Sequence, residues 1–158
     1  MARLFTNQIA DYLVNLIQTN IAGLRTVAKG SLDMLPAPTS LSSAAPGVIV
    51  EPGRVRISPV RIGSSFEIVY PFRLWYFRQY SPGEEVAEKL VQEAEAVVEL
   101  LFDNFQLPGF SQPNCLAVHG YPTIIDYAAT EDEVLQKVLE LPVSIVPIDY
   151  EVHTEARR

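Results

Sequence analysis

The sequence has only one cysteine, Cys115, so no disulfide can form within the chain. This cysteine usage is typical of proteins in reducing compartments. No apolar run approaches the ~20 residues needed to cross a bilayer. The first residues also lack the apolar stretch and small-residue cleavage site of a secretory signal. These absences predict an intracellular protein with no membrane contact.

Basic residues are scarce, since 12 Lys and Arg oppose 19 Asp and Glu to give a net charge of −7. Nucleic acids are held chiefly by cations that neutralise phosphates, so this balance disfavours a general nucleic-acid binder. It is compatible with a surface past which DNA slides without adhering. Hydrophobic residues make up 48% and charged residues 20% of the chain, which excludes a disordered protein. With 158 residues, we expect one domain spanning positions 1–158.

The common motifs of catalysis and cofactor binding are missing. There is no G-x-G-x-x-G or G-x-x-x-x-G-K-[ST] to hold a phosphate, no G-x-S-x-G nucleophile turn and no H-E-x-x-H zinc motif. His119, His153 and Cys115 are possible zinc ligands, but no second cluster completes a tetrahedral site. We therefore expect no cofactor, no metal and no catalytic residue.

One enzymatic alternative uses Cys115 as a nucleophile and His119 as its base. The cysteine lies in the run N-C-L-A-V, where a small buried hydrophobe is the more common role. Carboxylates cluster at positions 84–85 and 131–133, but both groups fall in the first turn of an expected helix, where the helix dipole favours them. A Cys-dependent enzyme is therefore the less favoured interpretation.

Three segments have the apolar spacing of amphipathic helices. The first covers Phe5–Asn20, with Thr6 as its expected cap. The second is the longest and covers Pro82–Phe105, with Ser81 as its cap and Phe105 at the end of its apolar stripe. A capping box at positions 130–133 opens a short third helix.

The rest of the chain contains segments with the composition and alternation of strands. The expected strands are Val48–Val50, Arg54–Ile62, Ser65–Tyr80, Asn114–Val118, Thr123–Tyr127 and Pro142–Val152. The run Gly120-Tyr121-Pro122 is expected to turn, and Arg54–Ile62 to form a solvated edge that carries arginines. The elements together predict an α+β fold: a mostly antiparallel sheet on which the N-terminal helix and the long capped helix pack, plus the short third helix.

Residues 26–47 form a Pro/Ser-rich stretch that includes Pro36, Pro38 and Pro46. This density of turn-forming residues disfavours regular structure before the strand at Val48–Val50. A loop of this length within a compact domain is usually functional or disordered. It is either a surface excursion or an arm that becomes ordered against another subunit, and we favour the arm.

The strand around residues 66–77 carries large apolar groups on both parities. One parity includes Phe66 and Leu74, and the other includes Trp75 and Phe77. A small domain with three helices at most has difficulty covering both faces of a sheet, so the second face is expected to meet a partner. Aromatic residues and arginine are enriched where proteins meet. The candidate subunit-interface residues are Arg73, Trp75, Phe77 and Pro147.

Two features of these candidates allow other interpretations. Arg73, Trp75 and Phe77 form a basic and aromatic strand that could stack the bases of single-stranded nucleic acid, although the net charge opposes this. At Pro147 the apolar parity of the last strand changes. Because proline cannot donate to a strand ladder, this change predicts either a β-bulge or a sheet edge.

The order of elements resembles the tail-terminator (tail-completion) proteins of long-tailed bacteriophages. The matching features are the opening helix, the proline-rich passage that ends in Ala45-Pro46-Gly47-Val48-Ile49-Val50, and the aromatic strand Phe66–Phe77. The capped helix Pro82–Phe105 and the final strand Pro142–Val152 complete the order. The resemblance covers nearly the whole chain as an order of elements and includes no invariant motif.

The resemblance implies a structural virion protein that is not an enzyme. It implies a homo-oligomeric ring, typically a hexamer, on the head-proximal end of the tail tube, where it ends tube polymerisation and provides the surface on which the head connector docks. The implied partners are further copies of the chain, the tail-tube protein, the neck proteins and, where the tail has one, the sheath. DNA is expected to pass through the lumen without specific binding. The implied location is the virion, with the host cytoplasm during assembly; another neck component, such as a connector, stopper or tube protein, is the alternative.

Overall fold

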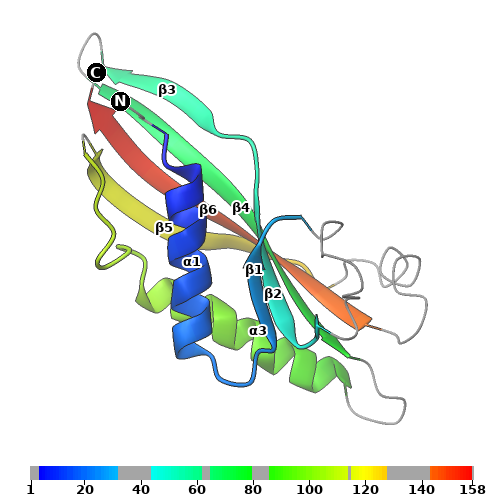
Figure 1. Ribbon diagram of the computed structural model, residues 1–158. Coiled ribbons are helices and arrows are strands. Elements are labelled where there is room, and N and C mark those ends of the chain that lie inside the picture. Colours follow the sequence, from blue (N-terminus) through cyan, green and yellow to red (C-terminus); the bar gives the residue numbers. More distant parts are fainter. Residues whose placement is uncertain are drawn as a thin grey trace.

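The computed structural model describes residues 4–31, 44–61, 65–79, 86–113, 115–127 and 143–157. The elements within these ranges are α1 (Thr6–Asn20), β1 (Thr26–Lys29), β2 (Gly47–Pro52), β3 (Arg56–Arg61), β4 (Ser65–Gln79), α3 (Val86–Asp103), β5 (Cys115–Ile125) and β6 (Val143–Arg157). They form an α+β arrangement of two helices and a six-stranded mixed sheet (Figure 1). The predicted α+β class is confirmed.

The sheet is built around the two long strands β4 and β6. The strand order is β1-β2-β4-β6-β5. β3 pairs with residues 65–69 of β4, on the same side of β4 as β2, which pairs with residues 72–77. The β1–β2 pair is parallel and the remaining described pairs are antiparallel. Strands β4 and β6 pair without a register shift from Ser65↔Arg157 to Gln79↔Val143. The β4–β6 pair is therefore the longest strand pairing in the sheet, and Figure 1 shows these strands as its two longest arrows.

Both helices lie on the same face of the sheet, where they form the main core. α1 buries Ile9, Leu13 and Ile17, which recur at helical spacing on one stripe. The stripe of α3 buries its middle residues, and the even-numbered residues of β4 and β6 face the same core. The buried members from these three elements are Ala94, Val97, Leu101, Ile68, Tyr70, Phe72, Leu74, Tyr76, Val146, Ile148, Tyr150 and Val152. The helical and strand periodicities of the sequence thus predict this core correctly.

The start of α1 differs from the prediction. Phe5 occupies the N-cap position without a side-chain cap, and Thr6 is the first helical residue, so the predicted Thr6 cap is wrong. The Phe5 side chain is buried, and its backbone N–H donates to the hydroxyl of Tyr70 at 3.3 Å. Packing against the sheet therefore fixes the beginning of this helix in place of a local cap.

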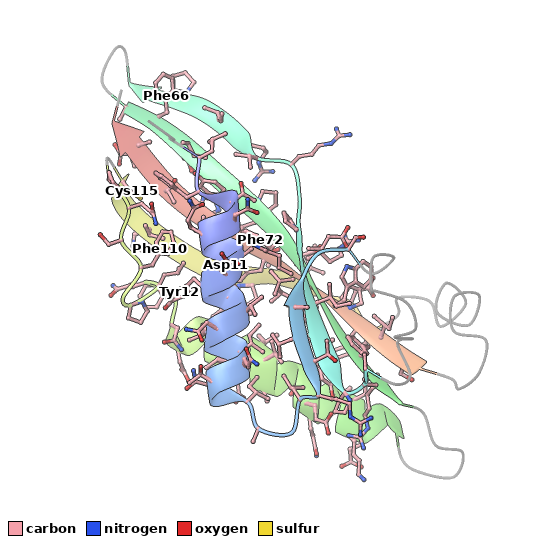
Figure 2. The ribbon with its side chains drawn as sticks, viewed as in Figure 1. Asp11, Tyr12, Phe66, Phe72, Phe110 and Cys115 are labelled. Carbon is pink, nitrogen blue, oxygen red and sulfur yellow. The ribbon has the colours of Figure 1, made fainter. Side chains whose placement is uncertain are left out.

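The middle of α1 contacts the segment that follows α3. The Tyr12 hydroxyl donates to the carbonyl of Pro108 at 2.8 Å, and the Tyr12 ring meets the Phe110 ring edge-to-face at 5.8 Å between centroids. Figure 2 shows these two side chains beside each other, to one side of α1. The contact joins segments almost a hundred residues apart in the sequence.

The long helix α3 ends at Asp103, before the predicted end. Phe105 lies beyond the helix and is exposed, so its predicted place in the apolar stripe is wrong. Leu107, held with a positive φ of 48°, is buried instead. The predicted Ser81 cap and the predicted third helix at 130–139 lie outside the described residues, within which α1 and α3 are the two helices.

The two short strands predicted at Asn114–Val118 and Thr123–Tyr127 are parts of one strand, β5. The segment runs as one strand from Cys115 to Ile125, and Gly120 pairs with Val152 of β6. The predicted turn at Gly120-Tyr121-Pro122 is therefore wrong. A β-carbon at position 120 would lie 1.9 Å from the Tyr150 hydroxyl oxygen, so the glycine allows a close approach of chain and ring.

The proline-rich stretch begins and ends in ordered structure. Thr26–Lys29 forms β1, which pairs in parallel with β2 and which the sequence composition did not predict. Ala44 and Ala45 are buried just before β2. The predicted arm at 26–47 is therefore wrong at both ends, where pairing and burial fix the chain, and the rest of it lies outside the described residues.

Candidate subunit interface on the open sheet face

The four predicted interface residues share the sheet face opposite the helices. Trp75 pairs directly with Pro147 in the β4–β6 ladder, and Arg73 and Phe77 lie two residues to either side of Trp75. Because alternate residues of a strand point to the same face, all four belong to one surface. We call this surface the open face. The four residues differ strongly in how much of each side chain is accessible.

Phe77 lies at the apolar end of the open face and is fully buried. It packs in a second, smaller cluster with Ile49, Ile145, Ala44 and Ala45. The segment leading into β2 covers this end of the open face. The apolar residues of β4 at this end of that face are therefore buried, wholly or in part, within the subunit itself. Phe77 offers no surface to a partner, which removes it from the predicted interface set. It also removes one of the rings that the nucleic-acid interpretation requires.

Trp75 is half-buried at the border between the apolar end and the polar remainder of the open face. Its indole Nε1–H donates to a Glu51 carboxylate oxygen at 2.6 Å. The Arg73 guanidinium lies 5.5 Å from the centroid of the indole ring, within the range of a cation–π contact. Arg73 also donates to Asp149 at 2.8 Å. The ring is thus held in place while part of its surface stays accessible, as in an interface residue ordered before binding.

The electrostatic state of Arg73 follows from the same contacts. The hydrogen bond to Asp149 raises the pKa of the Arg73 guanidinium above its usual value. Its positive charge is matched by Asp149 and by the nearby carboxylate of Glu51. A cation balanced by carboxylates is a poor phosphate ligand, so this site does not favour nucleic acid.

Pro147 is buried at the point where β5 ends. The backbone N–H of Asp126, one residue beyond β5, donates to the Pro147 carbonyl at 3.0 Å. After this point β6 lies between β4 and β5, whereas the preceding residues 143–146 pair only with β4 among the described strands. Pairing with β4 alone among the described strands is what the predicted edge requires, although the segment 128–142 lies outside the described residues. The bulge alternative is wrong for the β4 side, where the register is continuous.

A groove of about 430 Å³ crosses the open face beside Trp75. It runs between the end of β2, the middle of β4 and the end of β5. Its walls include Trp75, Arg73, Arg54 and the exposed side chain of Ile124. The mixture of an aromatic ring, an aliphatic side chain and paired charges is typical of a surface that meets another protein.

A chain of polar side chains occupies the other end of the open face. His153 lies between Glu67 at 3.3 Å and Glu151 at 3.0 Å, and its ring stacks on Tyr121 with centroids 5.1 Å apart. Arg56 of β3 pairs with Glu151 at 3.1 Å. We did not predict this network. The sequence feature that indicates this network is the polar residue at every second position of β6 (Asp149, Glu151, His153 and Glu155).

The alternative catalytic pair, Cys115 and His119, is not brought together. A register shift between Cys115 and Ala117 places Cys115 opposite Ala156, on the core side, while His119 pairs with His153 on the open face. Burial raises the pKa of the Cys115 thiol, which disfavours the nucleophilic thiolate. His119 instead stacks against Phe105 at 6.2 Å. This geometry does not support the Cys-dependent alternative.

The described residues contain neither a metal site nor a membrane-spanning helix, and the chain matches no known family. Among the described residues, no group of three or more His, Cys, Asp or Glu side chains could hold a metal ion. Neither described helix is long and apolar enough to cross a membrane. No known family model matches the chain, and no curated protein matches it.

Proposed function

We propose that this chain is a tail-terminator subunit of a long-tailed bacteriophage. In this role, copies of the chain form a ring, typically a hexamer, at the head-proximal end of the tail tube, end tube polymerisation and provide the docking surface for the head connector. The proposal rests on the resemblance in the order of elements. It takes its physical support from the surfaces described above.

The observation that carries the proposal is the open face, where half-buried Trp75 lines the groove. Both helices pack on the opposite face, so the groove beside Trp75 has no helix over it among the described residues. Trp75 is fixed by Glu51 and Arg73 before any partner binds. An ordered aromatic residue at the wall of a groove is a typical anchor for a protein contact.

The charge of the chain is consistent with the same role. A net charge of −7 suits a ring through which DNA passes without being held. Two cations of the open face are paired with carboxylates, Arg73 with Asp149 and Arg56 with Glu151. Another neck component, such as a connector, a stopper or a tube protein, would also have to let DNA pass without binding it, and is the alternative.

The proposal is tested by adding the purified chain to tail tubes that lack their terminator and to polymerising tube protein. Electron microscopy is expected to show a ring at one end of each tube, and light scattering is expected to show that tube growth stops. A Trp75→Glu variant is expected to lose both effects while keeping its melting temperature within a few degrees. A chain that stays monomeric with tubes present, and that leaves their growth unchanged, contradicts the proposal.

A further inference from the structure

We infer that the ring contact, which rests on the proposed function, joins the cationic edge at β3 of one copy to the acidic outer side of α3 of the next copy. A ring requires a heterologous contact, in which two different patches of the same chain fit each other. The two patches must therefore lie on different sides of the subunit and be complementary. Strands β3 and β5 are the opposite edges of one half of the sheet, and α3 packs near the β5 side. Figure 1 shows β3 and α3 well apart on the molecule.

The β3 patch is the outer edge of β3, where Arg54, just before the strand, and Arg56 lie toward the open face, and Ile57, which pairs with Ile68, lies toward the helix side. All three are exposed, and Ile57 keeps 56% of its surface accessible. Arg54 has no ion pair within the described part of the chain, whereas Arg56 is paired with Glu151 yet remains largely exposed. β3 pairs with β4 alone among the described strands, so its outer side is accessible for a contact. Arg54 also lines the groove, which makes the patch continuous with the open face.

The α3 patch consists of Glu99, Phe102 and Asp103. These three residues are exposed near the end of the helix, and Phe102 keeps 54% of its surface accessible. Glu99 and Asp103 have no ion pair within the described ranges, and the last turn of α3 contains no basic residue. A carboxylate at a helix C-terminus faces the negative end of the dipole, so Asp103 is unfavourable in an isolated subunit. A cation from a neighbouring copy would remove this penalty.

The two patches are complementary in chemistry. Each combines one accessible apolar side chain, Ile57 or Phe102, with charge of opposite sign that is unpaired within the described residues: Arg54 at β3, next to the Arg56–Glu151 pair, and Glu99 and Asp103 on α3. Opposite charges steer subunits together and fix their orientation, while a buried aromatic residue supplies affinity. Two identical patches of either kind would repel each other, so a symmetric two-fold contact through one patch is disfavoured. The complementarity therefore favours a contact from head to tail, as a closed ring requires.

The test uses two single charge reversals in the full chain, Arg54→Glu and Glu99→Arg. Each variant alone is expected to weaken self-association by about tenfold or more, measured by sedimentation velocity or native mass spectrometry with and without tail tubes. An equimolar mixture is expected to regain association, because the reversed β3 patch of one variant then meets the reversed α3 patch of the other, and their two unchanged patches also meet. Phe102→Ser should weaken association similarly, while Leu4→Ser, which changes a residue with 46% of its surface accessible, is the control and should not.

Circular dichroism establishes that each variant is folded before its association is compared. Unchanged association of the folded variants, or a mixture that does not recover, overturns the inference while leaving the tail-terminator proposal intact. Suppose that the single variants lose association and their mixture recovers it, but the rings neither cap tubes nor stop tube growth. This outcome supports the inference and overturns the proposed function. A chain that is monomeric under every condition overturns both.

Discussion

Tyr150 lies so close to the backbone of Gly120 that no side chain fits between them. The two residues are diagonal neighbours in the β5–β6 pair, and an added β-carbon would meet the phenolic oxygen at 1.9 Å and Leu107 at 2.9 Å. The Tyr150 ring is itself buried in the main core, and this burial raises the pKa of its hydroxyl group. The glycine therefore serves packing between the sheet and the segment after α3.

We expect Gly120→Ala to lower the free energy of unfolding by about 1–3 kcal/mol, the usual cost of overpacking a filled core. Urea unfolding measured by tryptophan fluorescence provides the value. Tyr150→Phe removes the nearest atom, so the loss caused by Gly120→Ala should be smaller in that background than in the native chain. Equal losses in the two backgrounds would show that the hydroxyl oxygen does not cause the strain.

Phe77 and Trp75 are expected to respond differently to truncation. Phe77→Ala creates a cavity in the smaller cluster and should lower the free energy of unfolding by about 3–5 kcal/mol. Trp75→Ala should cost less, because the indole is only half-buried, and should weaken assembly instead. Thermal melting and sedimentation of the same samples separate the two effects. A Phe77→Ala variant with native stability would contradict the burial described here.

The charge pair between Arg73 and Asp149 should contribute little to the stability of the isolated subunit. Both side chains are partly exposed, and exposed ion pairs usually contribute about 0.2–1 kcal/mol. Arg73→Ala is therefore expected to lower the free energy of unfolding by no more than about 1 kcal/mol, with a smaller difference at high salt. A larger loss would mean that the cation–π contact with Trp75 stabilises the sheet itself.

Cys115 should react slowly with alkylating reagents in the folded chain. Burial raises the pKa of its thiol, so the reactive thiolate is scarcer at pH 8 than in free cysteine. The profile of iodoacetamide reaction rate against pH is expected to shift to higher pH than in urea. The stability that the neutral thiol contributes is present at neutral pH and declines as the pH rises through the ordinary cysteine range. Cys115→Ala should remove that decline, and it should leave assembly unchanged.

Much of the fold could be predicted from periodicity. The stripe of α1 and the alternation in β4 identify most of the core, because the burial of one face imposes a period on the sequence. The errors arose where tertiary contacts override local signals. Gly120 and Pro122 are local turn signals, yet Tyr150 requires the glycine and the outer strand β5 tolerates the proline. β1 is stabilised by pairing with β2, and four residues without strong alternation do not indicate that pairing.

The candidate site was only partly predictable for a related reason. Period-two spacing placed Arg73, Trp75 and Phe77 on one face, but it could not show that Ala44 and Ala45 cover the last of them. Coverage depends on where a distant segment returns to the sheet. The hydrogen bond from Trp75 to Glu51 likewise joins two strands whose pairing is not encoded in the local sequence. The alternating polar residues of β6 were visible in the sequence and should have indicated the solvated end of this face.

The placement of β6 affects how the protein can fold on the ribosome. This strand emerges after every other described strand, yet it occupies the middle of the sheet and supplies the partner along one whole side of β4. Until residues 143–157 leave the exit tunnel, the nascent β4 has no partner along the side that β6 occupies, from Ser65 to Gln79. Translation that stops before β6 would therefore release a chain that cannot complete its sheet.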